Sequence, residues 1–133
     1  MTFFLDSNVL IFILRGTNHA VADKIESFPP SEIKIPSVVL SELIEGAHKS
    51  HNTKSNLETI LKLISPFEVI PFDRYAATIC GKLGAELEKE GKKIGPEDLY
   101  IAATVMSRGG ILVTNNTKDF ERIRGLHIED WCV

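Results

Sequence analysis

Residues 2–8 read TFFLDSN, a short apolar run that ends in an aspartate, a serine and an asparagine. A run this short that is rich in aromatic residues predicts a buried strand, and the strand ends at Asp6. Residues 8–14 then carry apolar side chains at helical spacing until Arg15 and Gly16 interrupt the pattern. The beginning of the chain therefore predicts a strand, a tight polar turn and a short helix.

Strands and helices continue to alternate along the chain. We expect further strands at residues 32–35, 67–72, 111–114 and 127–129, and helices at 20–28, 36–48, 51–64, 73–91, 96–108 and 115–121. Asn18 and Asp73 are the expected caps of two of these helices. Strands that are separated by helices predict an α/β fold with a central parallel sheet of about four to five strands, flanked by helices. At 133 residues, we expect one domain spanning 1–133.

Composition limits the class of protein. No run approaches the roughly 18 apolar residues that a membrane helix needs, and no signal peptide is recognisable, so we expect a cytoplasmic protein without membrane contacts. Cys80 and Cys132 match neither a disulfide framework nor a zinc site, which favours free thiols. The net charge of −3 argues against a protein that coats nucleic acid by bulk electrostatics, but it does not exclude an enzyme that acts on RNA.

Acidic residues recur where a parallel sheet would bring distant segments together. These candidate catalytic residues are Asp6, Glu42, Asp98 and Asp119. Ligands of such sheets bind beyond the carboxyl ends of the strands, which is where Asp6 lies and where Asp119 follows by one short turn. Clustered carboxylates need either a shared proton or a divalent cation, and oxygen ligands select Mg²⁺ or Mn²⁺. The sequence therefore predicts a metal-dependent enzyme.

Each of these positions also has a purely structural interpretation. Asp6 can cap the helix that follows it, and Asp98 gains about 0.3 to 1 kcal/mol from the dipole of its own helix without any function. Glu42 and Asp119 can be solvated surface residues. Asn115 and Ser7 are candidate supporting residues, which would hold a metal-bound water or fix a carboxylate, but both residue types also form turns routinely. The set of four acids is more specific than any one of them.

Four segments carry a resemblance to a known family. They read FLDSN (residues 4–8), SELIEGA (41–47), IGPEDLYIAA (94–103) and LVTNNTKDF (112–120). In this order and spacing they resemble the PIN-domain family, and within it the VapC-type toxins of bacterial toxin–antitoxin pairs. Ser7, Val39 and Glu97 stand where that family often has threonine, threonine and asparagine. Glu97 adds a negative charge beside Asp98.

The resemblance implies a function and a set of partners. It assigns the acidic site to Asp6, Glu42, Asp98 and Asp119, with Asn115 in support. It also implies a Mg²⁺- or Mn²⁺-dependent endoribonuclease that cuts RNA, with the anticodon stem-loop of a transfer RNA as the first candidate. The implied partners are a VapB-type antitoxin and a second copy of the chain, as a homodimer.

Metal-assisted hydrolysis of a phosphodiester fits these residues. Asp6, Asp98 and Asp119 are the expected metal ligands, while Glu42 either binds the metal through water or acts as the base. His48, Lys49, His51, Lys54 and Lys118 are candidate phosphate contacts at the rim.

Two other functions remain open from the residues alone. A phosphoryl-transfer domain also has an acidic Mg²⁺ pocket, although Asp6 lacks a second aspartate two residues later. A non-catalytic RNA-binding module would keep all four acids, and only turnover distinguishes it from an enzyme.

Overall fold

The computed structural model describes all residues of the chain, 1–133. Its centre is one sheet of five strands in which every neighbouring pair runs parallel. The strands are β1 (Phe3–Leu5), β2 (Ile33–Pro36), β3 (Glu68–Ile70), β4 (Ile111–Val113) and β5 (His127–Glu129). The predicted α/β fold with a central parallel sheet is confirmed.

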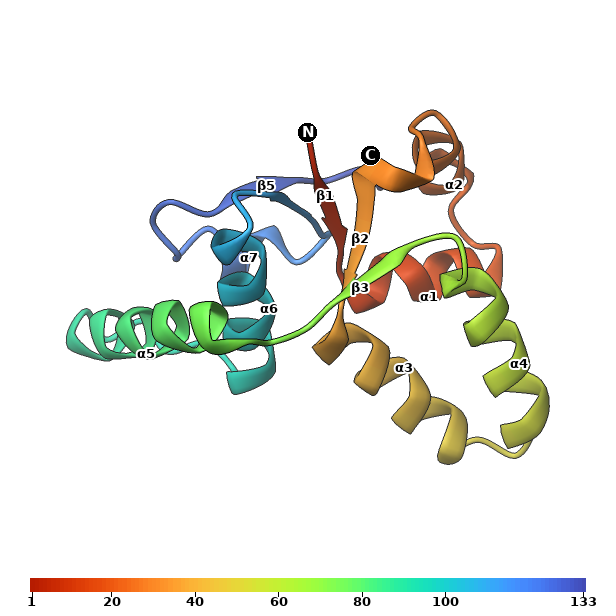
Figure 1. Cartoon of the computed structure of the whole chain (residues 1–133), viewed down its shortest axis with the longest axis horizontal. Helices are drawn as coiled ribbons and strands as arrows, with labels where there is room; N and C mark the ends of the chain where they lie inside the picture. The colour runs from red at the N-terminus through yellow and green to blue at the C-terminus, as the bar shows by residue number, and fades with distance from the viewer.

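Helices flank this sheet. They are α1 (Ser7–Arg15), α2 (His19–Glu26), α3 (Ser37–His48), α4 (Thr53–Ile64), α5 (Arg74–Lys89), α6 (Pro96–Ser107) and α7 (Thr117–Phe120), with a 3-10 turn at Pro30–Glu32. In Figure 1, α5 and α6 lie to one side of the central strands, and α1, α3 and α4 lie to the other. None of the helices combines the length and the apolar character that crossing a bilayer requires.

The helix boundaries follow the local chemistry of the sequence. Asn18 Oδ1 accepts a hydrogen bond from the Val21 amide at 3.1 Å. Asp73 Oδ1 accepts hydrogen bonds from the amides of Tyr75 and Ala76 at 3.1 and 3.0 Å. These contacts satisfy amides that have no partner inside their own helix, and both predicted caps are confirmed.

Strand order creates a switch point between β1 and β4. The order across the sheet is β3-β2-β1-β4-β5, so the chain builds outward from β1 in one direction and later returns to the other side of β1. Parallel sheets of this kind bind ligands where the order reverses, beyond the carboxyl ends of the strands. Leu5 pairs with Val113 in this register. The next residues, Asp6 and Thr114, therefore lie side by side at the switch point.

The strand that leads to Asp6 lies in the core of the fold. Phe3 is 3% exposed, and Phe4 and Leu5 are completely buried. Each such side chain stabilises the fold by about 1.5 to 3 kcal/mol relative to an exposed one. Asp6 thus follows a firmly packed strand, which fixes the position of its backbone. The two cysteines are free thiols, as expected: Cys80 is buried and Cys132 is half-buried.

Candidate active site

Asp6 is both a helix cap and the most buried acid of the candidate site. Its amide donates to the Val113 carbonyl at 3.0 Å, which continues the pairing of β1 with β4. Its Oδ1 accepts a hydrogen bond from the Ser7 amide at 2.8 Å and so caps α1. Only 5% of the residue is exposed. The structural and functional interpretations of Asp6 are compatible, because a carboxylate oxygen that accepts one hydrogen bond can still bind a second partner.

Thr114 holds the other oxygen. Its hydroxyl donates to Asp6 Oδ2 at 2.7 Å and accepts a hydrogen bond from the Asn116 amide at 3.0 Å. The threonine is completely buried. The carboxylate of Asp6 is therefore oriented from both sides. Burial raises its pKa, and the hydrogen bonds from Thr114 and Ser7 oppose that rise.

The segment after β4 also orients Asp119. Asn116 Nδ2 donates to Asp119 Oδ2 at 3.2 Å, from just before the helix α7 that carries the aspartate. Asn115, one of the two predicted supporting residues, is exposed, and its side chain makes no hydrogen bond within the chain. The contacts belong to its two neighbours, Thr114 and Asn116. The sequence signal that could have identified these two residues is the polar run that starts directly after the apolar residues of β4.

Asp98 lies in the first turn of α6, near enough to the other acids for their charges to act on it. Its pKa is raised from an ordinary value of 3.8 to about 6, first by burial and then by the negative charges of Asp6, Asp119 and Glu97. These neighbours come from three different segments of the chain. Asp6, Asp98 and Asp119 therefore share one electrostatic environment, as the sequence predicted.

Glu42 on α3 shares this environment, and together with Asp6, Asp98 and Asp119 it makes up the acidic cluster. Burial is the main cause of its raised pKa, and the charges of Glu97, Asp6 and Asp98 add to it. The Ser7 hydroxyl opposes the rise. Ser7 Oγ and Glu42 Oε1 are nevertheless buried without full hydrogen-bond geometry to any atom of the chain. Such unpaired buried oxygens are rare in folded proteins and indicate a place for a further polar group.

These residues fit a hard divalent cation. The donors are carboxylate, hydroxyl and amide oxygens, without a sulfur or imidazole ligand, which is the set that Mg²⁺ and Mn²⁺ prefer. The shared negative charge and the two unpaired oxygens both favour a cation and its waters at this point. No three carboxylates converge closely enough to form a finished coordination shell by themselves. The side chains would have to rotate toward the cation on binding.

The predicted cationic rim divides into two parts. Lys118 immediately precedes Asp119 and is exposed beside the site. His48, Lys49, His51 and Lys54 are also exposed, but they lie at the turn between α3 and α4, which projects away from the sheet in Figure 1. Lys49 is paired with Glu45 at 3.1 Å. Only Lys118 is thus adjacent to the acids.

Comparison with known proteins gives full-length matches. Residues 3–126 match the PIN domain family. The chain is 41% identical to the tRNA(fMet)-specific endonuclease VapC of Shigella flexneri over 98% of both chains. It is 40% identical to the protein of the same name from Salmonella typhimurium over 99% of both. A crystal structure of DNA-bound VapBC from Salmonella typhimurium superposes with a TM-score of 0.94, at 40% identity and 99% coverage of both chains.

Proposed function

The chain belongs to the PIN domain family, and from this premise we propose that it is a divalent-metal-dependent endoribonuclease and the toxin of a toxin–antitoxin pair. One observation carries the proposal: carboxylates from four separate segments share one environment at the switch point between β1 and β4. Full-length similarity to named endonucleases supports the same conclusion. The activity belongs in the cytoplasm, where its RNA substrate is found.

The chain's own residues divide the chemistry among them. When bound, Mg²⁺ or Mn²⁺ supplies positive charge to the phosphate and to the attacking water. Asp6, Asp98 and Asp119 would hold the cation, while Thr114 and Ser7 keep the Asp6 carboxylate in one orientation. Glu42 would either hold a water of the cation or accept the proton of the attacking water, because its raised pKa makes it a better base than an ordinary glutamate. The resulting step is hydrolysis of a phosphodiester.

The proposed substrate is tRNA(fMet), cut in its anticodon stem-loop. Two relatives at about 40% identity carry this specificity in their names. An endonuclease of this kind must discriminate among folded RNAs whose phosphate backbones are alike. The choice of target therefore has to depend on contacts with bases or with the shape of the loop.

Cleavage of total transfer RNA by the purified, antitoxin-free chain tests this function. With Mg²⁺ or Mn²⁺ we expect one transfer RNA to be cut, with product ends in the anticodon stem-loop, and no cutting in the presence of a chelator. An absence of cutting, measured on protein that demonstrably binds the metal, would leave only a phosphoryl-transfer or an RNA-binding role.

Replacing Thr114 by valine should reduce cleavage and Mn²⁺ affinity by about 10- to 100-fold, which is typical for the loss of a residue that orients a metal ligand. Valine has nearly the same shape but cannot donate to Asp6 Oδ2 or accept from the Asn116 amide. Thr114→Ser keeps the hydroxyl and should retain most of both properties. The readouts are cleavage rates and Mn²⁺ titration; a valine variant equal to wild type would show that Thr114 does not act through Asp6.

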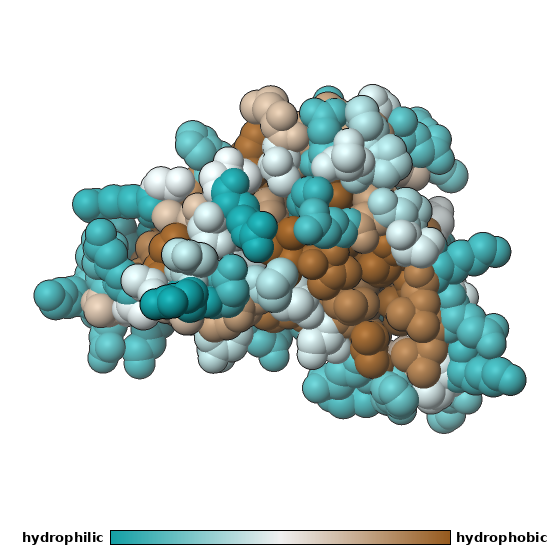
Figure 2. All heavy atoms as spheres, viewed as in Figure 1, coloured by the Kyte–Doolittle hydropathy of each residue, from teal (hydrophilic) through white to brown (hydrophobic).

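An apolar groove between α1, α3 and α4 suits the antitoxin. Figure 2 shows apolar side chains gathered between α3 and α4, beside α1. The groove is lined by Ile11, Leu14, Leu43, Ala47 and Ile60, with Arg15 at its rim. Arg15 is exposed and forms no ion pair, so it is free to meet an acidic group. A partner segment with an apolar face and a carboxylate beside it would match this surface, and we propose that the VapB-type antitoxin supplies it.

Gly46 gives a selective test of this docking surface. It lies within α3 and lines the groove, and a Cβ atom at this position would meet nothing within 4 Å. Gly46→Leu should therefore fold well, since leucine is a better helix former by about 0.5 to 1 kcal/mol. It should fill the groove and weaken binding of the co-expressed antitoxin at least about tenfold. RNA cleavage by the free chain should not change.

The matched control is Gly81→Leu, because Gly81 is also within a helix and also faces open space. Calorimetric titration of the antitoxin into each variant compares the two. Equal affinity for both would contradict the assignment of the groove.

The proposed toxin also forms a homodimer. Sedimentation should give twice the 14.8 kDa mass of the chain. A mass of one chain at micromolar concentration would reject the dimer while leaving the proposed activity intact.

A further inference from the structure

Both tyrosines of the chain are exposed, and one of them lies beside the acidic cluster. Tyr75 is 67% exposed and Tyr100 is 39% exposed. Exposure of a single aromatic ring is common and needs no function, so the position of Tyr100 and its contacts decide what it can do. The hydroxyl of Tyr100 has no hydrogen-bond partner within the chain, so nothing in the fold depends on it.

Tyr100 rests on a second aromatic ring. Its ring centroid is 5.2 Å from that of Phe72, with the two planes tilted by 57°. This is a favourable arrangement for an aromatic pair. Phe72 supports one part of the tyrosine ring and leaves the rest open to solvent. The pair joins α6 to the segment that follows β3.

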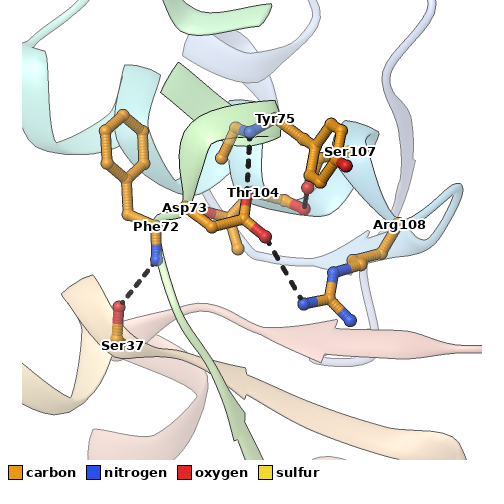
Figure 3. A network of polar contacts seen from close by, with 8 residues as sticks. Ser37, Phe72, Asp73, Tyr75, Thr104, Ser107 and Arg108 are labelled. Atoms are coloured by element: carbon orange, nitrogen blue, oxygen red, sulfur yellow. Dashed lines mark hydrogen bonds and ion pairs between the residues drawn. The ribbon is translucent and has the colours of Figure 1, made fainter. Parts of the chain in front are cut away.

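The support under Tyr100 is anchored by polar contacts. The Phe72 amide donates to Ser37 Oγ, at the start of α3, at 3.2 Å. The next residue, Asp73, caps α5 and pairs with Arg108 just beyond α6, with Nη2 and Oδ2 3.7 Å apart. Figure 3 shows these contacts converging on the turn that carries Phe72. Three helices therefore hold the turn, and a rigid base of this kind is what a binding platform needs.

The ring is close to the acids along the same helix. Glu97 and Tyr100 are three residues apart in α6, so their side chains lie on one face of that helix. Glu97 is near enough to Glu42 and Asp98 for its charge to act on both. Phe72 follows β3 and thus lies at the same edge of the sheet as Asp6, which follows β1. Tyr100 is therefore one helical turn from the cluster, on the side that faces α3.

The charges around Tyr100 determine what it can bind. Glu42, Glu97 and Asp98 repel the phosphates of an RNA, and Arg108 is already paired with Asp73. The neutral face of the Tyr100 ring is not repelled by these acids and offers RNA an attractive contact beside them. Unpaired bases bind such faces by stacking, and RNA-binding proteins use tyrosine in this way.

We propose that Tyr100, supported by Phe72, stacks on an unpaired base of the RNA next to the phosphodiester that is cut. This inference rests on the proposed nuclease function and adds a substrate contact to it. The bound feature is a single-stranded base in a loop, because a base inside a duplex has no free face. Tyr100 thereby selects unpaired RNA and positions it against the acids.

The test measures binding without metal, so that no cleavage occurs. The probe is a synthetic RNA hairpin with an unpaired loop, together with the same hairpin whose loop carries abasic residues. Tyr100→Ala should lower the affinity for the intact hairpin about tenfold or more, which is the usual range for loss of one stacked base. Tyr100→Phe should stay within about twofold of wild type, since the ring is kept. The abasic hairpin should bind wild type and Tyr100→Ala equally.

Tyr75→Ala is the matched control, because Tyr75 is more exposed and belongs to α5, which carries none of the four candidate acids. The Tyr75→Ala variant should bind the intact hairpin with the affinity of wild type. Equal binding of the intact hairpin by wild type and Tyr100→Ala would overturn the proposal. An equal loss of affinity for the intact and the abasic hairpin in Tyr100→Ala would also overturn it. A change of oligomeric state in Tyr100→Ala would overturn it as well, because the ring would then be a contact between two copies of the chain.

Cleavage by the same variants separates this inference from the proposed function. With Mn²⁺, Tyr100→Ala should raise KM about tenfold and leave kcat close to wild type. If wild type cuts RNA and Tyr100→Ala has the same KM, the stacking role alone fails. If wild type binds the hairpin with the expected dependence on Tyr100 but cuts no RNA, the nuclease function fails.

Discussion

Asp98→Asn is expected to lower RNA cleavage at least about a hundredfold while making the metal-free protein more stable at neutral pH. Activity should fall because asparagine removes a charged oxygen from the proposed cation site at the switch point. Stability rises because the ionised Asp98 is surrounded by Asp6, Asp119 and Glu97 and is partly buried. The substitution therefore separates the contribution of Asp98 to the cleavage rate from its unfavourable contribution to the free energy of unfolding.

The stability effect should depend on pH in a defined direction. The pKa of Asp98 is about 6 in the folded chain and 3.8 ordinarily, so the folded state binds this proton more tightly than the unfolded state. The stability associated with protonated Asp98 is complete below pH 3.8 and is lost as the pH rises through 6. Asparagine is neutral throughout. Its advantage should be near zero at pH 3.5 and about 1 kcal/mol at pH 7.5, after allowance for solvent screening and the helix dipole.

Urea unfolding in chelator at both pH values measures this difference. Asp23→Asn is the control, because Asp23 is exposed on α2 and should change neither cleavage nor the pH profile. Adding Mn²⁺ should stabilise wild type more than Asp98→Asn. The account is contradicted by an asparagine variant that still cuts RNA at the wild-type rate, or by one that is less stable than wild type at pH 7.5.

Gly110→Ala should be the most damaging small substitution for the fold. A Cβ at this position would lie 2.5 and 2.7 Å from two carbons of the Phe4 ring and 3.2 Å from the Thr2 carbonyl oxygen. Phe4 is completely buried in β1, so its ring cannot move without displacing the core. Forcing a methyl group into such a site costs about 1 to 3 kcal/mol, and we expect the upper end of this range.

Gly81→Ala, which is also a glycine-to-alanine substitution, should have the opposite effect on stability. Its Cβ would meet nothing within 4 Å in the middle of α5. Alanine should therefore stabilise the chain by about 0.5 to 1 kcal/mol. Urea titration of both variants tests the pair. A Gly110→Ala variant as stable as wild type would show that β1 and the start of β4 do not pack as closely as the structure has them.

The parts of the fold that depend on local chemistry could be predicted from the sequence. Apolar runs of strand length, interrupted by capped helices, indicate the parallel sheet. The caps at Asn18 and Asp73 lie where the residue types predicted them. Asp6 could be placed at the end of a strand because the apolar run stops there. These features need no knowledge of distant contacts.

Features that depend on strand order and register could not be predicted in this way. Thr114 contacts Asp6 only because β4 lies beside β1 with Leu5 paired to Val113, and the two strands are far apart in the sequence. Asn115, the predicted supporting residue at this strand end, comes one position after the residue that makes this contact. The groove beside Gly46 likewise depends on how α1, α3 and α4 pack together.

Ligand geometry is the remaining part that the sequence cannot supply. The four acids were predicted to cluster, and their mutual influence on pKa places them in one environment. No three of them stand ready around a cation. Carboxylates that repel one another settle apart, and the charge of a cation is what would draw their rotamers together.

Anomalous diffraction from crystals soaked in Mn²⁺ tests the central claim most directly, because it locates the cation without reference to activity. The account predicts a manganese peak bound by the carboxylates of Asp6 and Asp98, with Asp119 and Glu42 turned toward it directly or through water. A peak bound elsewhere on the chain, or none at a Mn²⁺ concentration that supports RNA cleavage, would contradict the claim that these acids form the metal site of the enzyme.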